Sequence, residues 1–378
     1  MKRFITLLAM VLLIVSSKTE NKEEVQQAEA YKIPVHAWMG LKKDATDEDL
    51  KTEFDDLKSK GVDRLMYSAG HDPEIYRRVG KIAKASGLEF HTWIPTMVQN
   101  NKPELKPEWY AVNRNGESAF DKPAYVEHYR FLCPNREEVY EFLKNLYGSV
   151  AEVEEVDGIH LDYIRFPDVI LARGLWDKYG LVMDKEHPQF DYCYCEKCLA
   201  DFKSASGIDI KEVEDPTQLE EWKQFRYDLI TKMVSRLSEV VRSKDKPITA
   251  AVFPGPKSQA MKLVRQEWNK WDLDAYYPMN YNDFYLEGTK WIGSVTKEEV
   301  LASSGKPVYS GLFICPKPEN KAAEKDPEGH GLLPEELEAG ISESMKNGAA
   351  GICLFTPGRM TDAHWKVFEK AIYTDYTK

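Results

Sequence analysis

The sequence lacks several features that would place it in a familiar class. Beyond its first residues it contains no cluster of Lys and Arg, and its formal net charge is -11. Because binding to a nucleic-acid backbone requires a basic surface, we expect no nucleic-acid partner. No G-x-G-x-x-G turn follows the first expected strand, which disfavours a dinucleotide-binding sheet. No H-E-x-x-H pair occurs either, which disfavours a zinc hydrolase of that type.

Cysteine is absent before residue 133, and the N-terminal apolar run, residues 4–15, is too short to span a bilayer comfortably. Two basic residues precede this run and small residues follow it, which is the pattern of a secretory signal. We expect a signal peptide over residues 1–17 with cleavage near Ser17, and a flexible linker over residues 18–30. The mature protein should then be periplasmic or secreted, with no transmembrane segment and no lipid-modified Cys anchor at this end.

From residue 31 onward, short β-like segments alternate with amphipathic helices. The expected strands cover residues 33–40, 62–70, 88–97, 158–166, 247–255, 273–283, 306–315 and 349–358. Strands that alternate with helices pair in parallel through right-handed crossovers. The sequence therefore predicts the α/β class and a single (β/α)8 TIM barrel over residues 31–378. An open doubly wound sheet is the alternative.

Two long segments, residues 98–135 and 167–225, follow the third and fourth expected strands. Both leave the C-terminal ends of strands, which is the face where such barrels bind and react.

The fourth expected strand ends in polar residues, in the stretch "VDGIHLDYIRFPD" (156–168). Because side chains alternate along a strand, His160 and Asp162 share a face and should point into the barrel near its mouth. One interpretation of Asp162 is a salt bridge with Arg165 or with another basic residue at a strand end. The other is a nucleophile or charge stabiliser at a reacting carbon.

Other strand ends carry aromatic, imidazole and amide groups, which suit a sugar subsite because aromatic faces stack on sugar rings and polar groups bind hydroxyls. The predicted substrate-binding residues are His36, Trp38, Tyr67, His91, Trp93, His160, Arg165, Asn280 and Tyr281.

The stretches "DGIHLDYIRFP" and "RQEWNKWDLDAYYPMNY" resemble the glycosyl-hydrolase-like family 10 barrels, bacterial glycosidases related to the wider α-galactosidase and α-amylase grouping. The resemblance covers most of residues 31–373. It implies that Asp162 is the nucleophile, and that the acid/base near the end of the sixth strand is Asp283, with Glu287 in reserve. His160 and Arg165 would hold substrate hydroxyls and keep Asp162 ionised.

A C-x-C-x-x-C motif places Cys193, Cys195 and Cys198 in the segment after the fourth strand. Three thiols around a tight turn suit a structural Zn²⁺, with Cys133 or His187 as the fourth ligand. A disulfide is the equal alternative, because exported proteins meet an oxidising environment.

The sequence thus predicts an exported glycoside hydrolase that acts on an oligo- or polysaccharide and needs no cofactor for catalysis. The alternative is a carbohydrate-binding barrel without turnover, which would need no second acid within reach of Asp162. Metal-dependent hydrolysis such as deacetylation, using His36, His91 or His160, is a third hypothesis, against which stands the lack of an H-E-x-x-H pair.

Overall fold

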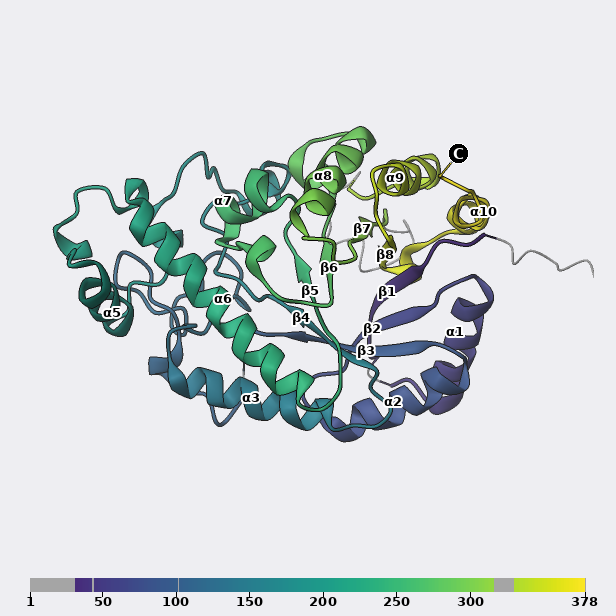
Figure 1. Cartoon of the computed structure of the whole chain (residues 1–378), viewed down its shortest axis with the longest axis horizontal. Helices are drawn as coiled ribbons and strands as arrows, with labels where there is room; N and C mark the ends of the chain where they lie inside the picture. The colour runs from purple at the N-terminus through teal and green to yellow at the C-terminus, as the bar shows by residue number, and fades with distance from the viewer. Residues whose placement is uncertain (1–30, 43, 101, 316–329, 378) are drawn as a thin grey trace, which may run out of the picture. The chain divides into compact units, whose positions relative to one another are not determined.

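Eight parallel strands form the centre of the structure, with helices around them (Figure 1). The computed structural model describes residues 31–42, 44–100, 102–315 and 330–377. The strands are β1 (Val35–Gly40), β2 (Arg64–Ser68), β3 (Glu89–Pro95), β4 (Gly158–Asp162), β5 (Ile248–Val252), β6 (Ala275–Pro278), β7 (Tyr309–Phe313) and β8 (Gly351–Phe355). The predicted signal peptide and linker, residues 1–17 and 18–30, lie outside the described residues.

The sheet runs in the order β6-β5-β4-β3-β2-β1-β8-β7, and every pair of neighbours is parallel. The two edge strands of this order, β6 and β7, also lie side by side. Parallel bridges join Tyr276 to Val308 and Met279 to Gly311. The predicted (β/α)8 TIM barrel is therefore confirmed.

Helices connect the strands on the outside of the barrel. They are α1 (Asp47–Ser59), α2 (Pro73–Ala85), α3 (Glu137–Ala151), α4 (Trp176–Tyr179), α5 (Glu196–Ser206), α6 (Glu220–Arg242), α7 (Met261–Val264), α8 (Thr289–Ala302), α9 (Pro334–Lys346) and α10 (Asp362–Ile372). Their starts follow local chemistry: Thr46 and Asp49 form a capping box at α1, and Asp72 caps α2 ahead of Pro73. In the part of the chain that the structure describes, no helix has both the length and the hydropathy of a membrane span.

Alternation along β4 separates an apolar outer face from a polar inner one. Ile159 and Leu161 belong to the main hydrophobic core between barrel and helices. On the inner face, a Cβ added to Gly158 would lie 2.3 Å from the His91 ring, so only glycine leaves room for that imidazole. His160 follows two residues later on the same face, fully buried.

The lower barrel interior is polar, whereas aliphatic residues usually fill such barrels. The Tyr277 hydroxyl lies 2.8 Å from both His36 Nδ1 and Arg64 Nη1. Arg64 also pairs with Glu89 at 2.8 Å, and Glu89 lies 2.8 Å from His91 Nε2. These charges and imidazoles thus form one connected network, in which Arg64 Nε and His91 Nδ1 have no hydrogen-bond partner among the described residues.

Two insertions leave the C-terminal ends of neighbouring strands. The first, residues 96–136, connects β3 to α3, and the second, residues 163–219, connects β4 to α6 and contains α4 and α5. Because β3 and β4 pair directly, both insertions begin at the same part of the barrel mouth.

Candidate active site

A cavity of about 400 Å³ lies at the C-terminal ends of the strands. The barrel contributes Trp38, Ser68, Trp93, Pro95, Asp162, Ala251, Met279 and Phe355 to its wall. The two insertions contribute Tyr125, Tyr129, Tyr163, Arg165, Asp168, Leu171, Ala172, Leu175 and Tyr179. An apolar wall with a few convergent polar groups is typical of a small-molecule site.

Asp162 is the last residue of β4, and its carboxylate is held on both oxygens. The chain turns sharply after it, since Tyr163 has a φ of +47°, in the left-handed region. The Tyr163 backbone N–H donates to Asp162 Oδ1 at 2.6 Å, and the Trp93 indole Nε1 donates to Oδ2 at 2.9 Å. Burial raises the pKa of Asp162, while these two hydrogen bonds and the charge of Arg165 oppose the rise. The result is a carboxyl group whose neutral form is favoured relative to an exposed Asp.

Asp168 is the second carboxylate in the cavity wall, and its surroundings differ. Its Oδ2 accepts hydrogen bonds from Arg165 Nη1 at 3.1 Å and from the Tyr125 hydroxyl at 2.7 Å. This carboxylate thus forms an ion pair and also accepts a hydrogen bond from a phenol. The ion pair of Arg165 is therefore with Asp168, and the sequence's simpler interpretation, a salt bridge between Arg165 and Asp162, is not the pairing observed.

Aromatic rings surround the Arg165 guanidinium. Its centre lies 5.0 Å from the Phe253 ring, 5.1 Å from Tyr163, 5.4 Å from Phe131 and 5.7 Å from Tyr129. Although burial disfavours its charge, the Asp168 carboxylate beside it raises the pKa of Arg165. Cation–π contacts add to that stabilisation, so the cation is fixed in place.

Part of the cavity wall is a group of aromatic rings. The Trp38 and Trp93 ring centres lie 6.4 Å apart, and Phe355 lies 6.0 Å from Trp93. Tyr281 stacks on Phe355 at 5.8 Å. Of the residues that the sequence predicts for substrate binding, Trp38, Trp93, Tyr281 and Arg165 thus line the cavity with Asp162.

The three predicted histidines lie in the barrel interior and do not line the cavity. Burial lowers the pKa of His36, His91 and His160, so each is neutral near pH 7. His160 Nε2 must accept from Trp38 Nε1 at 2.9 Å, because an indole only donates. Its Nδ1 therefore carries the proton and donates to Thr249 Oγ1 at 2.8 Å. Each histidine has a different partner, which does not suit a shared metal.

Two other predicted residues point away from the barrel interior. Tyr67 lies between the inward positions of β2 and packs on Phe54 and Phe90 at 5.9 and 5.7 Å. Asn280 follows the inward Met279 and donates to Glu299 at 3.1 Å, outside the strands. Here the structure differs from the sequence prediction: strand alternation turns Tyr67 outward, and Asn280 lies beyond the end of β6 at Pro278.

Asp283 and Glu287, the predicted acid/base and its reserve, lie outside the cavity wall. The chain leaves β6 at Pro278 and turns through a short 3-10 helix, Asn282–Tyr285. Asp283 Oδ2 accepts from the Gly331 backbone N–H at 2.6 Å, and Glu287 is exposed. Neither residue belongs to the cavity wall. The second acid in the cavity wall is instead Asp168. The sequence prediction gave this residue no role, although it is the last residue of the quoted stretch 156–168.

The predicted metal-ligating residues Cys193, Cys195 and Cys198 gather with Cys133, which comes from the first insertion. His187, the other candidate for a fourth ligand, lies 3.6 Å from Asp184 and is not in this group.

No protein-family model and no curated protein sequence matches the chain. Several solved structures, however, have a similar fold. The glycoside hydrolase domain of PgaB (BpsB) from Bordetella bronchiseptica has a TM-score of 0.65 and 12% identity, covering 90% of this chain and 99% of that one. The catalytic domain of β-amylase from Paenibacillus polymyxa has a TM-score of 0.61 and 12% identity, covering 92% and 99%. A β-galactosidase from the haloarchaeon Halorubrum lacusprofundi has a TM-score of 0.62 and 11% identity, covering 90% of this chain and 57% of that one. At this identity the likeness establishes the barrel fold, which these glycoside hydrolases share.

Proposed function

We propose that this protein is a glycoside hydrolase that cleaves an oligo- or polysaccharide. The observation that carries the proposal is the pair of carboxylates, Asp162 and Asp168, in one aromatic-walled cavity at the barrel mouth. Glycoside hydrolysis typically needs two carboxyl groups beside the scissile bond. The similar folds of a glycoside hydrolase domain, a β-amylase and a β-galactosidase support this chemistry.

The surroundings of the two acids suggest their roles. An enzyme separates its acid from its base by giving two carboxyl groups different environments. Burial favours the protonated form of Asp162, so this group would donate a proton to the leaving oxygen. The Asp168 carboxylate, which accepts hydrogen bonds from Arg165 and Tyr125, would act on the anomeric carbon, directly or through water, and oppose its developing positive charge. This assignment reverses the role that the family resemblance implies for Asp162.

The aromatic wall would position the sugar. Trp93 and Tyr281 would pack against a sugar ring, and Arg165 and Tyr163 would donate to its hydroxyl groups.

The test compares leaving groups. Asp162→Asn should lower activity on natural oligosaccharides by about 10²–10⁴-fold. It should retain most activity on dinitrophenyl glycosides, whose leaving group needs no proton. Asp168→Asn should lose activity on both. Asp283→Asn and Glu287→Gln are matched controls and should keep activity on both.

Wild-type activity of Asp162→Asn on oligosaccharides would overturn the assignment. Sugar binding by calorimetry without any hydrolysis would favour the alternative, a carbohydrate-binding barrel without turnover.

We also propose that the protein is exported, on the signal pattern of residues 1–17. N-terminal sequencing of the mature protein should begin near residue 18, and a retained Met1 in extracts would contradict export by this route.

A further inference from the structure

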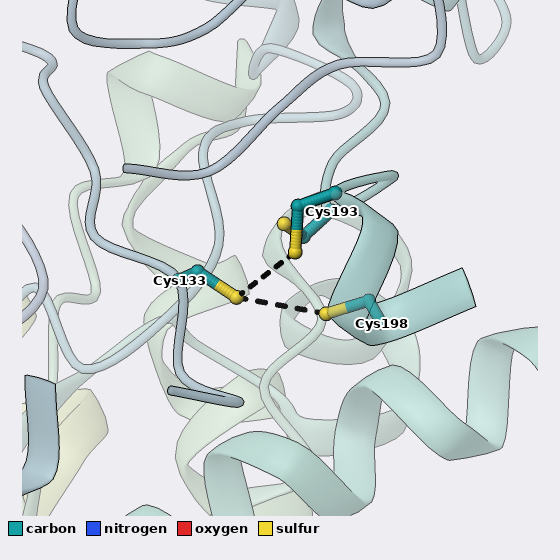
Figure 2. A group of neighbouring side chains, drawn as sticks. Cys133, Cys193 and Cys198 are labelled. Atoms are coloured by element: carbon teal, nitrogen blue, oxygen red, sulfur yellow. Dashed lines mark hydrogen bonds between the residues drawn. The ribbon is translucent and has the colours of Figure 1, made fainter. Parts of the chain in front are cut away.

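Four cysteine thiols from two separate insertions converge outside the cavity. Cys133 lies near the end of the first insertion, whereas Cys193, Cys195 and Cys198 lie in the second. Figure 2 shows the sulfur atoms of Cys133, Cys193 and Cys198 pointing toward one another. All four are buried, and their sulfur atoms lie within 4.8 Å of one another.

The spacing fits one tetrahedral metal ion. Four sulfurs at about 2.3 Å from Zn²⁺ stand about 3.8 Å apart in a regular tetrahedron. Cys133 Sγ lies 3.6 Å from Cys195 Sγ and 3.5 Å from Cys198 Sγ. A disulfide instead needs about 2.05 Å between its two sulfurs. All four cysteines are free in the structure.

The backbone around the thiols also suits thiolates. Cys195 is the N-cap of α5 and Cys198 lies in its first turn, where the helix dipole favours negative charge. The Val112 backbone N–H points at Cys193 Sγ, 3.5 Å away. Such N–H donors to the ligand sulfurs are the outer partners that stabilise metal thiolates.

We propose that Cys133, Cys193, Cys195 and Cys198 bind one Zn²⁺ as a structural site. Four protein thiolates complete a tetrahedral shell, so no position is left for substrate or a reactive water. The metal would act as a clamp that joins the first insertion to the second.

The clamp would support the cavity wall, because each insertion contributes to it. Tyr125 in the first insertion donates its hydroxyl hydrogen bond of 2.7 Å to Asp168 in the second. Directly before Cys193, the second insertion is anchored to α6, where Arg226 donates to Asp191 and to the Tyr192 carbonyl. Loss of the metal would therefore loosen the contact between the two insertions and leave it to backbone hydrogen bonds such as Tyr194 N–H to the Val112 carbonyl at 2.7 Å and Arg114 N–H to the Asp191 carbonyl at 3.0 Å. The first insertion, which lacks the Arg226 anchor, would be affected more.

The full-length protein, purified without chelator, should contain one Zn²⁺ per chain by elemental analysis. A mercurial reagent should displace that equivalent from the thiolates, and a zinc-sensitive dye should then measure it. Replacing Zn²⁺ with Co²⁺ should give the thiolate charge-transfer and intense visible bands of a tetrahedral site. Cys195→Ser should lose the metal, whereas the matched control Cys315→Ser, outside the group, should retain it.

Metal-free protein should melt several degrees lower and be cut by protease first within residues 96–136. Two disulfides by mass spectrometry with no metal, or a full zinc content in Cys195→Ser, would overturn the proposal. If Cys195→Ser does not fold, the Co²⁺ spectrum of the wild type decides. The metal readouts do not depend on the proposed function. Only the expected fall in glycosidase activity on metal removal rests on it.

Discussion

Trp93 and Asp162 are joined across neighbouring strands by a hydrogen bond of 2.9 Å from the indole Nε1 to the carboxylate Oδ2. Trp93→Phe removes this donor but keeps an aromatic ring. Because the donor stabilises the ionised carboxylate, its loss should raise the pKa of Asp162 further.

If Asp162 acts as a protonated acid, activity falls as pH rises through its pKa. The basic limb of the kcat/KM profile of Trp93→Phe should then move to higher pH by about one unit. A matched control, Trp271→Phe, loses an indole hydrogen bond of 3.1 Å to Thr231 and should leave the profile unchanged. A shift confined to the acidic limb would mean that Asp162 works ionised.

The pairing of Arg165 with Asp168 predicts a strong effect on stability. Both side chains are almost fully buried, so Arg165→Met leaves a carboxylate without its cation, at a cost of about 3–5 kcal/mol in the free energy of unfolding. The double variant with Asp168→Asn should lose clearly less than the sum of the single variants. Urea unfolding measures all three. The exposed pair Lys51–Asp55 is the control, where Lys51→Met should cost under about 1 kcal/mol. Additive losses at Arg165 and Asp168 would contradict the coupling.

Glu299 predicts a dependence of stability on pH. Burial raises its pKa from 4.5 to about 8, although the Gly255 N–H and Asn280 partly oppose this. Between these two values the folded chain holds a proton that the unfolded chain has released. The free energy of unfolding should therefore fall as pH rises through this interval, by up to about 1.4 kcal/mol per pH unit from this group.

Glu299→Gln, neutral at every pH, should lack that contribution, so the difference in unfolding free energy between wild type and variant should change steadily over the interval. Asn280 Oδ1 has no partner, and turning its amide over would let it accept the proton of Glu299. Parallel curves for the two proteins would contradict a proton on Glu299.

His160 predicts a fixed tautomer. Its pKa is well below 6.5 because of burial, and protonation would set an N–H against the indole N–H of Trp38. Nitrogen NMR should show a neutral ring with the proton on Nδ1 at pH 6.5, where the imidazole of the unfolded chain is about half protonated. Trp38→Phe should release Nε2 and allow both tautomers. A wild-type ring that titrates between pH 6 and 7 would contradict this assignment.

The sequence predicts the barrel well, because the alternation of strands and helices is a local pattern that survives in the fold. It also places Trp38, Trp93 and Asp162 at the barrel mouth, since each lies on the inward side of a regular strand. The same reasoning fails for Tyr67, which ends a strand but has the outward parity.

The rest of the site depends on contacts that no local pattern encodes. After Pro278 the chain leaves strand geometry, so period two no longer tells where Asn280 and Asp283 point. Tyr125 and Asp168 meet because two long insertions fold against each other, over 43 positions in the sequence. The sequence offers Cys133 as a ligand only because of its residue type. Its position beside Cys198 also depends on the tertiary fold of the two insertions. The resemblance to glycosyl-hydrolase-like family 10 stays a prediction.

The Trp38 indole and the His160 ring close the barrel axis beneath Asp162. Under the proposed function, a polysaccharide bound in the cavity would therefore have no path along the barrel axis. A glycan would have to approach from the open rim, either by inserting a terminus or by lying across the entrance, and the fragments would depart by the same route. Release of one product fragment would then compete directly with binding of the next glycan chain.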